Sequence, residues 1–336
     1  MGDIVLLGLD GGATKVLTQA CTIDSKSSLI TPVGGFAESI YHDAATFSPD
    51  FSPVDLEQQQ KEASSHKYRV TEQEEKQSAS IIKTIVRTLS TFEGENKISL
   101  LGLCFPGVKT PKLDGISIMA NGPRNIKMLS MINNKIKTDE HKKLMIREIY
   151  DDSECCLIGE WKSSIGKLQN IENAIYIGGG TGIADGIILD NKIIDLRNSK
   201  EIERSWELIM PTGKSVEYFL SLEGMLNQWG KGRSIKAMQS LLEHAASGDM
   251  AACQIIENAA QAFDYLIKNR ISFFHSHGAA PEKIVVGQRL GSMLSDDDSP
   301  ISRVIFQKNL AIPIEISTHR NTAALGAAYK SYDSHK

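Results

Sequence analysis

The sequence predicts an α/β protein of two lobes, each with a mixed β-sheet flanked by helices. A chain of 336 residues exceeds the ~100–200 residues usual for one domain, which indicates two domains. Short apolar runs alternate with helical patterns but without a regular βαβα repeat, so hairpins within mixed sheets are expected. The third observation is an internal repeat. Residues 6–24 and 174–190 share one layout: an apolar strand, small residues with a threonine, and a second apolar strand ending in aspartate.

Composition and charge exclude several classes of function. The chain has 37 lysines and arginines against 41 aspartates and glutamates, and a net charge of -4 provides no global basic field for nucleic acid or anionic lipid. No apolar stretch approaches the ~20 residues of a membrane helix, and the start MGDIVLLGLDGG lacks a basic leader, so a cytoplasmic protein is expected. Five cysteines without C-x-x-C spacing indicate reduced thiols rather than a cysteine-rich zinc site.

The chain is expected to begin with a β-hairpin. Residues 4–9 form a short apolar run, Gly11 and Gly12 interrupt it, and residues 16–23 resume it with partial alternation. This pattern predicts two antiparallel strands joined by a glycine turn.

The stretch 47–77 is expected to be an exposed insertion or loop. It is rich in Glu, Gln and Ser and holds Pro49 and Pro53, so it has too few apolar residues to contribute to a core. From Glu72 onward the pattern becomes helical, and residues 100–104 follow as a strand.

A group of breakers, Asn121-Gly122-Pro123, marks the expected start of the second lobe. Further strands are predicted at 116–120, 145–150, 174–177, 186–189 and 283–286, and helices at 151–166, 216–229, 234–246, 249–274 and 323–332.

Two glycine turns carry the pattern of a phosphate site. Without Cβ atoms, the backbone can approach an anion and direct several N–H donors at it. In the first turn Thr14 adds a hydroxyl donor, Lys15 a positive charge, and Asp10 can hold Mg²⁺ through water. The alternative is a simple hairpin turn, for which one or two glycines suffice, but a second turn at 178–182 favours phosphate binding. Neither turn fits the P-loop or Rossmann pattern.

Four motifs, LGLDGGATK, LGLCFPGVK, YDDSECCLIGE and IGGGTGIADGII, in this order and spacing, resemble the ROK family of sugar kinases within the actin/hexokinase/Hsp70 ATPase superfamily. The resemblance covers nearly the whole chain. It implies two actin-like, ribonuclease H-like lobes with a cleft between them, where the two turns grip the phosphates of ATP and the sugar lies between them. The closing helix is then expected to return to the first lobe, so the predicted lobes are 1–122 with 316–336, and 123–315.

The resemblance implies roles for individual residues. Asp152 is the general base that takes the proton of the sugar hydroxyl, although an aspartate pair here also suits a helix N-cap. The residues implied in nucleotide and phosphate binding are Asp10, Gly11, Gly12, Thr14, Lys15, Gly179, Gly180, Thr181, Gly182 and Gly287. The residues implied in sugar binding are Asn125, Asp151, Glu207 and Glu217.

The chain departs from the family at several positions. Asp151 replaces the usual asparagine, and Gln288 replaces the second glycine of a turn beside the adenine. Met210 stands where the family has a zinc-binding histidine, and the cysteine cluster that follows is missing, so no structural zinc is expected. Without that metal, Glu207 and Glu217 could equally be surface charges.

The predicted function is ATP-dependent phosphorylation of a hydroxyl of a hexose or N-acetylhexosamine, with ATP and Mg²⁺ as cofactors and the sugar as the small-molecule partner. A homodimer is left open. One alternative is a kinase of the N-acetylglucosamine kinase/BadF type, whose Asp-Gly-Gly-Gly-Thr-Lys resembles residues 10–15. Another is a catalytically inactive sugar or nucleotide sensor, in view of Ala13 and the departures above. DNA binding is not expected, because the first glycine turn begins at residue 10 and leaves no room for the helix-turn-helix of ROK repressors.

Overall fold

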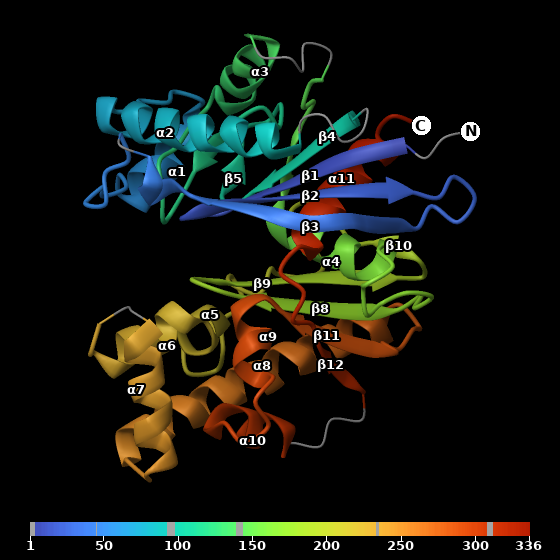
Figure 1. The fold of residues 1–336 in the computed structure, drawn as a ribbon. Helices are drawn as coiled ribbons and strands as arrows, with labels where there is room; N and C mark the ends of the chain where they lie inside the picture. The colour runs from blue at the N-terminus through green and yellow to red at the C-terminus, as the bar shows by residue number, and fades with distance from the viewer. Residues whose placement is uncertain (1–3, 45, 93–97, 139–143, 233–234, 308–311) are drawn as a thin grey trace. The chain divides into compact units, whose positions relative to one another are not determined.

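The computed structural model describes residues 4–44, 46–92, 98–138, 144–232, 235–307 and 312–336 (Figure 1). The chain divides into two compact units, Met1–Gly166 with Asn321–Lys336, and Lys167–Arg320. These boundaries differ from the predicted ones after residues 122 and 315. The first unit continues beyond the breakers at 121–123 because Arg124 is fully buried in that unit, where it forms ion pairs with Glu62 and Glu74. The predicted cleft between the lobes stays a prediction.

The first unit is built on a mixed sheet with the strand order β3-β2-β1-β4-β7 (Figure 1). Its strands are β1 (Ile4–Gly11), β2 (Lys15–Ile23), β3 (Ile30–Ile40), β4 (Ile98–Phe105) and β7 (Ile149–Asp151), and a separate small ladder joins β5 (Val108–Lys109) to β6 (Ile116–Ile118). The pairing of β1 with β2 is antiparallel, which confirms the predicted hairpin, whereas β1, β4 and β7 are parallel. The carboxyl ends of these three strands therefore lie at the same edge of the sheet.

Helices cover both faces of this sheet. They are α1 (Leu56–Ser65), α2 (Glu72–Leu89), α3 (Met128–Thr138), α4 (Asp152–Lys162) and α11 (Thr322–Asp333), with the single turns η1 (Tyr41–Asp43) and η2 (Ser90–Phe92). Because side chains alternate along a strand, Leu7 and Leu9 of β1 pack with Ile82 of α2 on one face, while Leu6 packs with Leu325 of α11 on the other (Figure 1). The return of the closing helix to the first unit is thus confirmed.

The closing helix lies with its backbone directly on its neighbours. A Cβ atom at Gly8 of β1 would lie 1.7 Å from the carbonyl oxygen of Ala324, and one at Gly326 would lie 1.9 Å from that of Cys155 in α4. Real Cβ atoms essentially never come within 3.0 Å of another heavy atom, so glycine is required at both positions. This close packing fixes α4, which follows Asp151, relative to β1, which ends near Asp10.

The segment 47–77 is mostly exposed, as expected, but the prediction that it is a loop without core residues was wrong. The segment contains α1 and the start of α2, and Gln59, Glu62 and Glu74 are buried. Their polar groups have partners: the Gln59 side chain bonds the backbone N–H and carbonyl of Met119, and both glutamates pair with Arg124. Polar residues can form core here because their hydrogen bonds are made inside the protein.

The second unit repeats the sheet of the first. Its strand order is β10-β9-β8-β11-β12, formed by β8 (Ala174–Gly179), β9 (Ile183–Leu189), β10 (Lys192–Ile193), β11 (Lys283–Gly287) and β12 (Ile314–Ile316). As in the first unit, three strands pair antiparallel and two more continue the sheet in parallel. The repeat found in the sequence is therefore a repeat of sheet topology.

The helices of the second unit are α5 (Val216–Leu220), α6 (Leu222–Trp229), α7 (Ile235–Ala246), α8 (Met250–Ser276), α9 (Gln288–Leu294) and α10 (Pro300–Phe306). The helix predicted over 216–229 is divided, because Ser221 is extended and its side chain accepts the N–H of Gly224, which starts α6 as a cap. No helix in the described ranges combines the length and apolarity needed to cross a bilayer.

Candidate functional site

The first glycine turn joins β1 to β2 at the edge where the parallel strands end. The pairing of Gly11 with Val16 closes the hairpin, and the N–H of Gly12 donates to the carbonyl of Lys15 over 2.8 Å. A Cβ at Gly11 would meet the Phe105 ring at 2.3 Å, so packing alone demands glycine there. At Gly12 a Cβ would come no closer than 3.4 Å to any atom, so the fold does not require glycine at that position.

Thr14 and Lys15, the two residues of this turn predicted to donate to a phosphate, have different surroundings. Thr14 is exposed, and its carbonyl accepts the N–H of Tyr41 over 2.9 Å. The Nζ of Lys15 pairs with Glu38 of β3 at 2.6 Å, with about a third of the lysine side chain exposed. The positive charge predicted for phosphate binding is thus shared with a carboxylate in this structure.

Asp10 and Asp152 form an acidic pair beside this turn. Asp10, the last residue but one of β1, is in register with Cys104 of β4, which pairs in turn with Tyr150 of β7. Asp152 follows β7 as the first residue of α4. Burial and then the negative charge of Asp152 raise the pKa of Asp10 to about 7, against the lowering effect of the Cys104 hydrogen bond and of Lys15. Burial also raises the pKa of Asp152. Each carboxyl group is therefore easier to protonate than a solvated one.

A buried lysine neutralises Asp151, the first aspartate of the pair at 151–152. The Nζ of Lys109 lies 2.6 Å from Oδ1 of Asp151 and donates to the carbonyls of Phe105 and Gly107 at 2.6 and 2.8 Å. Only 2% of the lysine side chain is exposed. Its charge also lowers the pKa of Asp152, opposing burial and the charge of Asp151.

Lys109 is the last residue of the motif LGLCFPGVK, but no role was predicted for it. An available signal was the replacement of an expected asparagine by Asp151, since an added buried charge needs a cation nearby.

Asn125 is nearly buried near Phe105, the residue that also contacts Gly11. Both residues line a void of about 10 Å³, and Phe105 pairs in register with Asp151. The Oδ1 of Asn125 accepts the N–H of Lys127 over 3.1 Å. Phe105 thus neighbours several of the predicted residues of the first unit, although sequence analysis gave it no role.

The second glycine turn resembles the first but is one residue shorter. Gly179 pairs with Ile183, and the N–H of Gly180 donates across the turn to the carbonyl of Gly182 over 2.8 Å, as Gly12 does to Lys15. A Cβ at Gly180 would meet nothing within 4 Å. Thr181 and Gly182 are exposed at the tip of the turn.

Gly287 and Glu217 lie beside this second turn. Gly287 pairs with Gly178 in the parallel ladder of β11 and β8. The Oε2 of Glu217 accepts the N–H of Ile183 over 3.0 Å, and burial followed by the charge of Glu223 raises the pKa of Glu217 in spite of that bond. The structure therefore brings Glu217, predicted for the sugar, into contact with the strand that leaves the turn.

Comparisons with known proteins fit this arrangement. No family model and no curated protein matches the chain. A ROK family glucokinase from Streptomyces griseus in complex with glucose and AMPPNP matches at 14% identity and a TM-score of 0.61, covering 99% of this chain and 100% of that one. A ROK hexokinase from Thermus thermophilus matches at 15% identity and a TM-score of 0.62, covering 99% of each chain. The chain has the ROK fold.

Kinases are not the only proteins with the ROK fold. A ROK family transcriptional regulator, described as a homologue of the E. coli MLC protein, matches at 15% identity and a TM-score of 0.60, covering 98% of this chain and 78% of that one. The predicted fold class, with actin-like halves and mixed sheets flanked by helices, is confirmed, while the likeness by itself assigns no activity.

Glu207 and Met210, at the positions of a sugar-binding glutamate and a zinc-binding histidine in the ROK family, both make contacts within the second unit. Glu207 forms an ion pair with Arg204, and that pairing lowers the pKa of Glu207. The Met210 side chain is buried in the core of the second unit, and its backbone closes a tight turn by accepting the N–H of Gly213 and donating to Lys214, each over 2.8 Å. Among the described residues, no group of three or more His, Cys, Asp or Glu could hold a metal ion.

Tyr41 is a further residue that sequence analysis missed. It follows β3, its N–H bonds the first turn, and its hydroxyl is buried with no hydrogen-bond partner among the described residues. Burial and then the charge of Asp10 raise the pKa of Tyr41. No local sequence signal marks this phenol, because its place depends on β3, which was not predicted.

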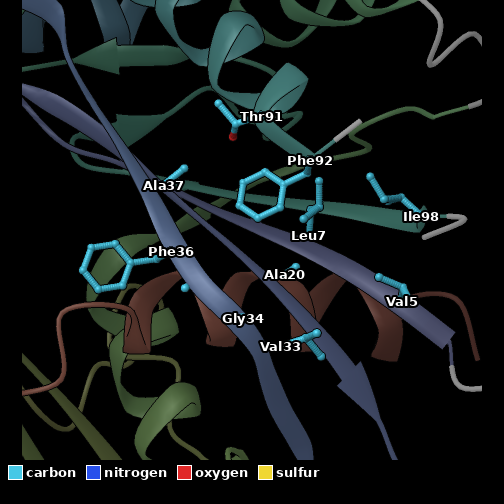
Figure 2. A pocket seen from close by; sticks show the side chains of 11 residues that line it. Val5, Leu7, Ala20, Val33, Gly34, Phe36, Ala37, Thr91, Phe92 and Ile98 are labelled. Atoms are coloured by element: carbon cyan, nitrogen blue, oxygen red, sulfur yellow. The ribbon is translucent and has the colours of Figure 1, made fainter. Parts of the chain in front are cut away.

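An apolar cavity of about 290 Å³ lies in the first unit away from these residues (Figure 2). Figure 2 shows apolar side chains from β1, β3 and η2 around it. Its lining includes Leu7, Ala20, Val33, Phe36, Phe92 and Ile98. None of the described residues that line the cavity is charged.

Proposed function

We propose that this protein is an ATP-dependent kinase that phosphorylates a hydroxyl group of a hexose or N-acetylhexosamine. The observation that carries the proposal is the pair of similar turns, in which Gly12 and Gly180 each directly follow the last paired residue of the incoming strand and are not required to be glycine by packing. A close ligand explains glycine at both positions, because an added Cβ would stand between the backbone and an anion. Several ROK-fold structures bear the names of sugar kinases, which agrees with this reading.

Each turn would contribute N–H donors to the phosphates of ATP. The N–H groups of Gly12 and Gly180 are used within their turns, so the remaining donors are those at the tips, at Thr14 and Lys15 in one and Thr181 and Gly182 in the other. Gly11 and Gly179 would allow the strands to pack closely behind these tips, and Gly287 would border the nucleotide.

Asp10 fits a site for Mg²⁺ bound through water. Its pKa of about 7 reflects burial and repulsion by Asp152, and a nearby cation would oppose both effects and keep the carboxylate ionised. Magnesium, when bound with ATP, supplies positive charge that offsets the charge of the phosphates.

Asp152 would act as the general base. The sugar hydroxyl oxygen forms a bond to the γ-phosphorus, its proton passes to the Asp152 carboxylate, and the bond from that phosphorus to the oxygen of the ADP leaving group breaks. A carboxylate whose pKa is raised is a stronger base than that of a solvated aspartate, and such catalysis contributes ~10²–10⁴-fold. Asn125, Glu217 and the accessible part of Asp151 would orient the sugar.

A binding protein without kinase activity is the second candidate. It is favoured by the ion pairs that engage two predicted sugar ligands, Asp151 with Lys109 and Glu207 with Arg204. A carboxylate held by a cation has fewer lone pairs left for sugar hydroxyls.

The test is a coupled assay of ADP release with Mg-ATP and a panel of hexoses and N-acetylhexosamines. We expect sugar-dependent turnover in the wild type, its loss by at least 10²-fold in Asp152→Asn, and no change in Asp190→Asn, an exposed aspartate in the second unit that serves as the matched control. If the wild type releases ADP no faster than Asp152→Asn for every sugar of the panel, the kinase proposal is refuted. Calorimetric sugar binding without ADP release would then support the binding protein.

A further inference from the structure

We infer that the buried ion pair of Asp185 and Arg270 positions residues 203–207 against β9, the strand that follows the second glycine turn. The inference rests on the proposed function, because it assigns the pair a part in presenting the sugar-binding side of the second unit.

Both side chains of the pair are buried, and each of their nitrogen and oxygen atoms makes a hydrogen bond. The Nε of Arg270, in α8, lies 2.6 Å from Oδ2 of Asp185, in β9, and the two side chains are 0% and 1% exposed. The Nη1 of Arg270 donates to Asn269 Oδ1 over 2.6 Å. The remaining groups of the pair bind backbone: Nη2 of the arginine donates to the carbonyl of Glu203 over 2.8 Å, and Oδ1 of the aspartate accepts the N–H of Ser205 over 3.0 Å.

The backbone that it binds belongs to a long irregular segment. Between β10, which ends at Ile193, and α5, which begins at Val216, the structure has no helix or strand, only an isolated bridge between Ile209 and Ser215. Segments of this length inside a compact unit need specific anchors to hold one conformation. The ion pair supplies two of them from elements far away in the sequence.

The same network reaches the glycine turn and Glu217. The Oγ of buried Ser205 donates to the carbonyl of Ile183 over 3.4 Å, and the N–H of Ile183 donates to Oε2 of Glu217 over 3.0 Å. Ile183 directly follows the turn tip at Gly182. Residues 203–207, the turn and Glu217 are thus linked by hydrogen bonds to one buried charge pair.

Stability alone does not account for such a pair. Replacing a buried ion pair by apolar residues of similar volume is often neutral or stabilising, because removing both charges from water is costly. Directed hydrogen bonds to Glu203 and Ser205 are what apolar residues could not replace. The geometry therefore points to placement of the segment as the role of Asp185 and Arg270.

The test separates placement from stability with the double variant Asp185→Leu/Arg270→Met, which removes both charges and keeps the volume. We expect it to unfold cooperatively, with amide hydrogen exchange at residues 203–207 at least tenfold faster than in the wild type and exchange in β11 unchanged. The Michaelis constant for the sugar should rise at least tenfold, with kcat altered less than threefold. Lys268→Met, which breaks an exposed ion pair to Asp264 on the same helix, should change none of these values.

Arg270→Lys provides a second measurement that keeps the charge. The single nitrogen of a lysine cannot stand at both the Nε and Nη2 positions from which Arg270 reaches Asp185 and Glu203, so exchange at 203–205 should again increase. Wild-type exchange at these residues in either folded variant would overturn the inference. If neither variant folded, the pair would be required for folding rather than placement, and the inference would also fail. Absence of sugar-dependent turnover in the wild type would instead refute the proposed function while leaving the exchange result to decide the role of the pair.

Discussion

Asp10 provides the sharpest test of the electrostatics around the first glycine turn. Its carboxyl group is buried near Asp152, which raises its pKa from 3.8 to about 7. The folded protein therefore keeps a proton on Asp10 at pH values where the unfolded chain has released it. Stability must then fall as the pH rises from about 4 to about 7 and stay level above that range.

The size of this effect follows from the shift. Each pKa unit corresponds to about 1.4 kcal/mol, so the full shift would cost the folded state about 4 kcal/mol at pH 8. Although the carboxyl group is buried, the Asp10 residue as a whole keeps part of its surface exposed, so water reduces the penalty and about 2–4 kcal/mol is expected. Asp10→Asn removes the charge and should recover this amount at pH 8, with little gain at pH 4.

The assay is urea unfolding of the wild type and Asp10→Asn at intervals from pH 4 to pH 8. Asp249→Asn is the control of opposite sign, because hydrogen bonds from the first turn of α8 lower the pKa of Asp249 and the wild type gains stability from it as the pH rises. A stability difference between Asp10→Asn and the wild type that does not vary with pH would refute the reasoning. Under the proposed function, the stabilised Asp10→Asn would also lose sugar-dependent turnover, the usual trade between stability and activity.

Three further experiments test other parts of the first and second units. Lys109→Met should lower the free energy of unfolding by about 3 kcal/mol because it leaves Asp151 unpaired, and adding Asp151→Asn should restore most of the stability. Because Lys109 lowers the pKa of Asp152, its loss should also move the acidic limb of the pH profile of activity to higher pH. Strictly additive effects of the two substitutions in urea titrations would contradict the pairing. Gly326→Ala, whose Cβ would lie 1.9 Å from the Cys155 carbonyl oxygen, should cost about 2 kcal/mol in thermal unfolding despite better helix propensity, and an unchanged melting temperature would count against the close packing. Gln288→Gly should add about 0.5–1 kcal/mol by relieving a left-handed φ of 58°, and a loss of stability would show that the Gln288 side chain contributes more than the strain costs.

Features that depend on neighbouring residues were predictable from the sequence. The β1–β2 hairpin and its second copy in β8–β9 follow from apolar runs broken by glycines, since antiparallel strands pair across a short turn. The layout repeated at 6–24 and 174–190 extends in the structure to two complete sheets of the same order. Short strands such as β10 and β12 carry too few residues for a pattern to show.

Burial of polar side chains was not predictable, because it depends on partners far away in the sequence. Glu62 and Glu74 look like surface residues until Arg124, which lies beyond the next strands, closes over them. The same reason explains the misplaced domain boundary. Breakers at 121–123 indicate a change of direction in the chain, but only the buried guanidinium shows that the first unit continues.

In the candidate site, too, the features that follow from local sequence were predictable and the ion pairs were not. Motifs located the turns and the aspartates, because those residues follow directly from the ends of β1, β7 and β8. They did not reveal that Asp151 is held by Lys109, because that ion pair joins residues far apart in the sequence. The pair of Glu207 with Arg204 joins residues only three positions apart, but it lies in an irregular segment whose conformation no sequence pattern specified. The two pairs are also what favours a binding protein over a kinase, so the part that sequence analysis missed bears directly on function.

The glycines offer a physical criterion for separating ligand contact from packing. At Gly8 and Gly326 an added Cβ would collide with backbone, so these glycines are explained by the fold. At Gly12 and Gly180 an added Cβ would meet no closer contact than 3.4 Å, and neither has the positive φ that would favour glycine for its conformation. Alanine at these two positions should leave the folded state intact and, if phosphates approach the turns, weaken ATP binding in both variants. Since the two sites belong to separate units with the same sheet order, a common effect on ATP would tie the duplicated topology to one ligand.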